Sequence, residues 1–174
     1  MDTTPLHPLI VHLPMALAVL MPLVAGGMLL AWWRGYFRKR TWSIVCLLQA
    51  AMLASSLVAM RTGEDDEERV EQVVADAAIE QHEEAAELFT WGSGLLLVVS
   101  LMPLLLRSQG KARAAGLLTV GGTLVMLGLG YNVGSAGGEL VYKHGAAAAF
   151  TATDQGTPSR SPARHGEDDE DDHR

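Results

Sequence analysis

Four long apolar stretches dominate the chain, and short polar segments separate them. None of the four contains Asp, Glu, Lys or Arg, and they cover residues 9–33, 42–60, 88–106 and 114–133. About 20 apolar residues in a helix cross the core of a bilayer, and a helix satisfies its own backbone polar groups in lipid. The pattern therefore predicts an all-α protein with a bundle of four transmembrane helices.

The polar segments between these stretches differ in charge. Residues 34–40 (RGYFRKR) and 107–113 (RSQGKAR) hold Arg and Lys but no acid, whereas residues 61–87 are rich in Asp and Glu. Short loops with Lys and Arg near the ends of spans stay in the cytoplasm. We therefore expect a multi-pass membrane protein with both termini and the acidic segment on the extracytoplasmic side.

The acidic segment also has a periodic pattern of its own. Its apolar residues recur at roughly helical spacing, with charged residues between them: Val70, Val73, Val74, Ala77, Ala78 and Ile79. Such spacing is typical of an amphipathic helix. The sequence thus predicts an extracytoplasmic amphipathic helix between spans two and three, running into the third span.

Composition divides the 174 residues into two parts and narrows the class of protein. Residues 1–150 form the predicted membrane domain, and residues 151–174 are polar and end in an acidic run, which is typical of a disordered tail. The net charge is −7, and the basic residues lie mainly in the two short loops. Nucleic-acid binding is therefore not expected. Cys46 is the only cysteine, so no intramolecular disulfide forms.

Histidine provides the main clue to chemistry. Outside the tail the chain has His7, His12, His82 and His144, and the predicted topology places all four at the extracytoplasmic ends of spans. Imidazole there can ligate haem iron, ligate a bare metal ion, or titrate with external pH. Hydrogen bonds to loop carbonyls or headgroups are the alternative for each histidine taken alone.

The opening motif HPLIVHLP contains two of these histidines, and its prolines affect the backbone conformation around them. Five helical residues turn by about 500°, so His7 and His12 fall on different faces, roughly 7.5 Å apart along the axis. Pro8 favours an extended conformation at His7, which would place His7 outside the helix. Pro14 clashes with the carbonyl of Ile10 and predicts a broken helix start.

Enzyme motifs are missing from the chain. HExxH, CxxC, GxSxG and P-loop patterns do not occur, and no Glu lies three residues before His82. The sequence therefore favours a redox carrier or a binding protein over a stand-alone enzyme.

Several motifs together resemble a family of bacterial membrane proteins. They are HPLIVHLPMAL at 7–17, TGE at 62–64, IEQHEEA at 79–85 and GGELVYKHG at 137–145. The family is domain of unknown function 2231, and the likeness spans residues 5 to about 150. It implies a four-helix membrane domain, found in some members beside c-type cytochrome domains, and it nominates His7, His12, His82 and His144.

Two functional hypotheses follow, with a third as the plainest alternative. In the first, two of the four histidines bind haem b and pass electrons to a periplasmic c-type cytochrome or a quinone. His12 is then the favoured axial ligand, with His82 or His144 opposite. In the second, the histidines and nearby glutamates hold zinc, copper or iron. In the third, the protein is a subunit of a membrane complex and its histidines only stabilise it. The oligomeric state is left open.

Overall fold

The computed structural model describes residues 6–151, which are helical apart from short connections. Four long helices carry the apolar stretches: α2 (His12–Trp33), α3 (Ser43–Val70), α4 (Asp76–Leu105) and α5 (Gln109–Tyr142). Three short helices flank them: α1 (His7–Ile10), the 3-10 helix η1 (Lys39–Trp42) and α6 (Ala148–Thr151). Each of four helical segments is long and apolar enough to cross a membrane, so the predicted four-span protein is confirmed.

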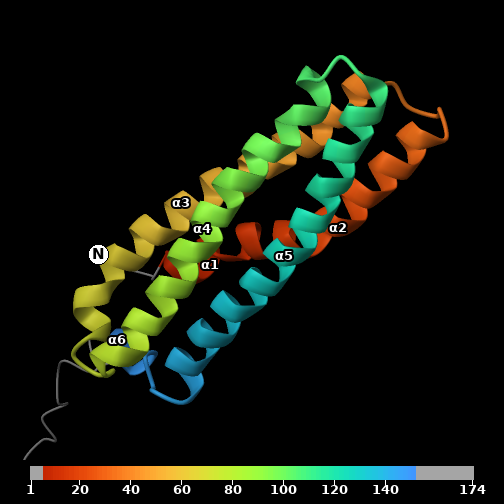
Figure 1. Cartoon of the computed structure of the whole chain (residues 1–174). Coiled ribbons are helices and arrows are strands. Elements are labelled where there is room, and N and C mark those ends of the chain that lie inside the picture. The colour runs from red at the N-terminus through yellow and green to blue at the C-terminus, as the bar shows by residue number, and fades with distance from the viewer. Residues whose placement is uncertain (1–5, 152–174) are drawn as a thin grey trace, which may run out of the picture.

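The long helices form an up-down bundle in which each helix packs against two neighbours. Helix α2 packs against α3 and α5, and α4 packs against the same two helices (Figure 1). Large apolar side chains on the outer surface are exposed, among them Leu23, Leu47 and Leu95. A bilayer covers such a surface, because lipid tails are as apolar as leucine.

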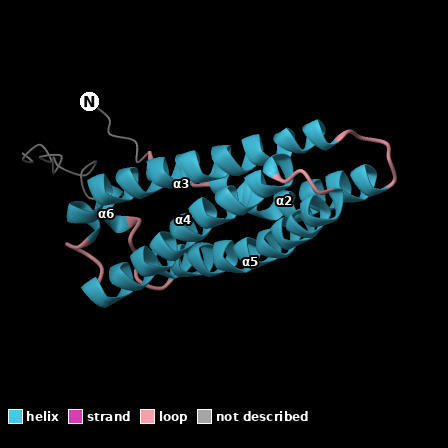
Figure 2. Cartoon of the chain, turned by 45° about the horizontal axis from the view of Figure 1, so that its top comes forward, coloured by secondary structure: helices cyan, strands magenta, loops and turns pink. Residues whose placement is uncertain are grey.

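The two ends of the bundle differ in charge. The connections at residues 34–38 and 106–108 meet at one end, which we call the basic end, whereas the turn at 71–75 and α6 lie at the opposite, acidic end (Figures 1 and 2). At the basic end Lys39 Nζ donates a hydrogen bond of 2.6 Å to the carbonyl of Leu106. The charge separation along the chain is therefore also a separation in space.

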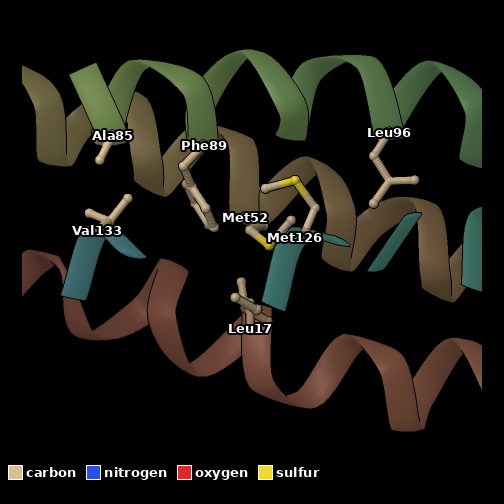
Figure 3. Packing of buried hydrophobic residues seen from close by; sticks show 8 residues of the cluster. Leu17, Met52, Ala85, Phe89, Leu96, Met126 and Val133 are labelled. Carbon is tan, nitrogen blue, oxygen red and sulfur yellow. The ribbon is translucent and has the colours of Figure 1, made fainter. Parts of the chain in front are cut away.

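The bundle interior holds two apolar clusters and several polar contacts. Leu17, Met52, Phe89 and Met126 converge from all four long helices in the first cluster (Figure 3). The second lies nearer the basic end and contains Met21, Trp32, Trp42 and Cys46, among others. The polar contacts include a 2.9 Å hydrogen bond from Trp42 Nε1 of η1 to the carbonyl of Ser100 of α4. Such bonds between helices are worth about 0.6 kcal/mol each in a membrane.

The acidic segment consists of two helix ends joined by a turn. Helix α3 continues to Val70, a turn covers residues 71–75, and α4 begins at Asp76 and runs into the third span, while the amphipathic character predicted for this segment stays a prediction. Glu and Arg, which favour helix, follow the apolar part of α3 and allow it to continue. Val74 and Ile79 pack with Ala146 in a small apolar cluster at the acidic end. The acidic segment is thus a helical hairpin that prolongs two spans.

The helix start has the predicted break but not the predicted conformation at His7. The helix is interrupted at Val11, between α1 and α2, as Pro14 leads one to expect. The expectation that His7 lies outside the helix is wrong, because His7 is the first residue of α1. A contact between its ring and α3 offsets the bias from Pro8. The predicted disordered tail lies outside the described residues, apart from Thr151.

Candidate functional site at the acidic end

His7 is held against α3 by a hydrogen bond from its ring. Its Nδ1 lies 2.8 Å from the carbonyl oxygen of Ala59, and the hydroxyl oxygen of Thr62 lies 3.4 Å from the same nitrogen. A carbonyl oxygen only accepts, so Nδ1 carries the proton and donates it to Ala59. The other ring nitrogen, Nε2, therefore carries a free lone pair when His7 is neutral.

His82 approaches the same place from α4 and is half-buried. Its Nδ1 is buried and has no hydrogen-bond partner among the residues that the structure describes. A buried polar atom without a partner costs free energy, so its retention calls for an explanation such as ligand binding.

The two imidazole rings meet edge to face. Their centroids are 6.3 Å apart and their planes are inclined by 89°. Glycines on two other helices leave room for them: a Cβ at Gly63 of α3 would lie 3.3 Å from His7 Cε1, and one at Gly137 of α5 would lie 3.1 Å from His82 Cε1. Four elements thus shape the space around one histidine pair.

A small cavity of about 50 Å³ adjoins the pair. Residues from α1 to α5 line it: His7, Val11, Pro14, Met15, Ser56, Ala59, Met60, His82, Ala86, Phe89, Thr90 and Val133. The lining contains two imidazoles, two thioethers and two hydroxyls but no carboxylate and no thiol. Besides His82, Thr90 also has a buried polar atom, Oγ1, that lacks a partner among the described residues.

Burial sets the protonation of His82. The residue lies almost two helical turns before Leu88, where the apolar span starts, and is therefore about 9 Å outside that span along the helix axis. Burial lowers the pKa of His82 below its ordinary value of 6.5; a charge on His7 lowers it further, and the backbone of Val133 raises it. Neutral imidazole, the form that binds metal ions, is therefore favoured at this position.

The other two predicted histidines lie apart from this pair. His12 is exposed, and its Nδ1 is 3.3 Å from the carbonyl of Leu9, three residues earlier in the chain. His144 is also exposed and lines a separate shallow hollow with Gln81 and Glu139. The structure thus brings together His7 and His82, whereas the sequence favoured His12 opposite His82 or His144.

Glutamates of α3 and α4 form a negative surface next to the pair. Burial raises the pKa of Glu83, and the charges of Glu67, Glu64 and Glu87 raise it further. Their side chains do not complete a ligand set with His82: among residues 6–151, no three His, Cys, Asp or Glu side chains gather in a way that could hold a metal ion. The glutamates therefore contribute negative potential to the site.

Reasoning from the sequence missed the residues that position the pair. Ala59, Gly63 and Gly137 have no side-chain chemistry, and Met15 and Met60 look like ordinary residues of apolar spans. The one available signal was the pair of motifs TGE and GGEL, because Gly63 and Gly137 lie in them and contact His7 and His82.

Fold and site together define a multi-pass membrane protein with a histidine pair inside one end of its helical bundle. The chain belongs to the family DUF2231, described as a predicted membrane protein, whose model matches residues 3–150. No curated protein and no solved structure matches the chain. The family resemblance seen in the sequence motifs is therefore confirmed.

Proposed function

We propose that this protein is a membrane metal-binding protein and that His7 and His82 ligate one metal ion at its extracytoplasmic end. The observation that carries the proposal is the approach of the two rings to 6.3 Å beside a shared cavity. An ion about 2.0–2.1 Å from one nitrogen of each imidazole keeps the two ring centroids roughly 5–6.5 Å apart, depending on the angle between the two bonds at the ion. The observed separation has this magnitude.

The hydrogen bond of His7 supports the same function. Histidines that ligate metals commonly donate their other ring N–H to a carbonyl or carboxylate, which fixes the tautomer and the direction of the ring. His7 makes such a bond from Nδ1 to Ala59 and keeps Nε2 available. On His82 the buried Nδ1 without a partner is the matching ligand atom.

The distribution of charge supports the extracytoplasmic placement of the site. Arg and Lys gather at the basic end, and the positive-inside rule places such loops in the cytoplasm. With an even number of spans, both termini and the histidine pair then lie on the extracytoplasmic side of the bacterial inner membrane. Metal would reach the site from the periplasm, past the glutamates of α3 and α4.

Haem b fits this site poorly. The cavity beside His7 and His82 has a volume of about 50 Å³, whereas pockets for drug-sized ligands measure about 300–1,000 Å³. A haem macrocycle needs a space on that larger scale, and His12 and His144 are exposed away from the pair. A single ion suits the geometry better, and electron transfer to a c-type cytochrome or a quinone stays a prediction.

Metal content of the purified protein tests the proposal. The full chain is prepared in detergent with His165→Gln and His173→Gln, so that tail histidines contribute nothing. It is then equilibrated in turn with copper(I), zinc(II) and iron(II), desalted and analysed for metal. We expect one equivalent of at least one ion, lost in His7→Gln and in His82→Gln.

The matched controls are His12→Gln and His144→Gln, which remove exposed imidazoles near the same end of the bundle. Both should retain the metal. If the starting protein binds none of the three ions, or if the control variants lose the metal as fully as the pair variants, the proposal is wrong. A structural role of the histidines in a membrane complex would then be the better account.

A further inference from the structure

We propose that the ion is copper(I), held by the imidazoles of His7 and His82 together with the thioethers of Met15 and Met60. This inference rests on the proposed metal-binding function and names the ion. It comes from the composition of the cavity, where two methionines accompany the two histidines. The four ligands derive from four elements, one each from α1, α2, α3 and α4.

The donor atoms decide which metal this cavity prefers. Thioether sulfur is a soft ligand that selects copper(I), and imidazole nitrogen also binds copper well. Zinc sites use thiolate, imidazole and carboxylate, normally with four such ligands. The cavity lining offers two imidazoles but no thiolate and no carboxylate, so it lacks half of the ligands of such a zinc site. It has four neutral donors, of which the two thioethers are soft.

Charge leads to the same ion. All four proposed ligands are neutral, and apolar residues such as Val11, Phe89 and Val133 form much of the remaining lining. The cost of moving an ion out of water into a medium of low polarity is large and rises steeply with its charge. A site without an anionic ligand therefore accepts a monovalent ion far more readily than a divalent one.

The positions of the methionines are suited to this role. Met60 directly follows Ala59, whose carbonyl fixes His7, and Met15 directly follows Pro14, the residue that breaks the helix start. Both methionines are half-buried, whereas Met21 and Met52 are fully buried and do not line the cavity. A methionine side chain has three rotatable bonds, so its sulfur can adjust to an ion in an irregular space.

The buried polar atoms supply an independent indication of a ligand. Two of those without a partner among the described residues, His82 Nδ1 and Thr90 Oγ1, belong to residues that line this cavity. A cavity that were merely a packing defect would be lined by apolar groups alone.

Competition for copper(I) under anaerobic conditions tests the inference. The full chain in detergent, with the tail histidines replaced by Gln, competes with a chromophoric copper(I) chelator, and zinc(II) binding is measured in parallel. We expect one copper(I) per chain. Met15→Leu with Met60→Leu should weaken copper(I) binding by roughly tenfold or more. The control, Met21→Leu with Met52→Leu, should change it by less than about twofold, since Leu replaces Met at similar volume.

X-ray absorption at the copper edge provides a second measurement that needs no methionine variant. In a Cys46→Ala background every protein sulfur is a thioether, and copper should show both nitrogen and sulfur neighbours. Two results would overturn the inference and leave the metal-binding function in place. In the first, the protein binds one equivalent of zinc through His7 and His82 but no copper(I). In the second, it binds that zinc, and replacement of Met15 and Met60 has no effect on copper(I) affinity. If the protein binds neither zinc nor copper(I), both the proposed function and this inference are wrong.

Discussion

The rings of His7 and His82 meet at 89° with their centroids 6.3 Å apart, although His7 begins α1 and His82 lies in α4. Contacts with other helices determine the position of each ring. The carbonyl of Ala59 fixes one ring, and the missing side chain of Gly137 makes room for the other.

Adjacent glycines on α5 should respond in opposite ways to an added methyl group. Alanine in place of a helical glycine stabilises by roughly 0.5–1 kcal/mol. At Gly138 a Cβ meets nothing within 4 Å, whereas at Gly137 it would lie 3.1 Å from His82 Cε1. We expect Gly138→Ala to raise the melting temperature by about 2–4 °C. Gly137→Ala should gain less or lose stability; equal gains in thermal unfolding would show that His82 is not confined by Gly137.

Stability of the metal-free protein should fall in mildly acidic solution because of His82. Its pKa is lower in the fold than the value of 6.5 expected for the unfolded chain, mainly because of burial. As the pH falls, the unfolded chain therefore takes up a proton before the folded protein does. The contribution of His82 to the free energy of unfolding is fully present above pH 6.5 and is lost as the pH falls through the folded pKa. Chemical unfolding from pH 8 to 5 should show a shallower decline in His82→Gln than in the starting protein, with His144→Gln, which changes an exposed imidazole, as the control.

Removal of the charge on Glu83 should stabilise the protein at neutral pH. Burial and the charges of Glu67, Glu64 and Glu87 raise the pKa of Glu83, so the ionised form is disfavoured in the fold and this cost grows as the pH rises through the folded pKa. Relief of like-charge contacts in Glu83→Gln should raise the melting temperature by about 1–2 °C at pH 7. The same change at Glu84, which is not among the carboxylates acting on Glu83, serves as control. A larger gain in Glu84→Gln would contradict this explanation.

The orientation in the membrane can be read from the reactivity of introduced cysteines. In a Cys46→Ala background, Asp76→Cys lies at the acidic end and Ser108→Cys at the basic end. Because basic loops stay in the cytoplasm, a membrane-impermeant maleimide added to intact spheroplasts should label position 76 and spare position 108 until the cells are broken. Labelling of position 108 alone would show the opposite orientation, with the histidine pair on the cytoplasmic side.

Apolar patterning predicted the spans because the bilayer imposes their length and composition. It could not predict where α3 and α4 end beyond the membrane. There, charged residues that favour helix and the apolar cluster around Ile79 determine whether the chain continues or turns. The separation of His7 and His12 onto different faces did follow from helical geometry, and the structure has it: His7 contacts α3 while His12 is exposed.

The sequence could not predict that His82 is the residue that pairs with His7, and the reason is physical. Which residues of two membrane helices face each other depends on the rotation of each helix, and packing sets that rotation. Glycines such as Gly63 and Gly137 act through the side chain they lack, so their effect appears only when a neighbouring ring is in place. All four histidines could thus be assigned to one end of the bundle, but not to a common site.

A double-mutant cycle at the two histidines tests the central claim most directly. Copper(I) affinity is measured for the starting protein, His7→Gln, His82→Gln and the double variant, with His12→Gln as the control. If both imidazoles ligate one ion, each single change should remove most of the affinity and the double variant should lose little more than either, which is strong non-additivity. Independent, additive losses, or affinity unchanged in either single variant, would contradict a shared metal site between His7 and His82.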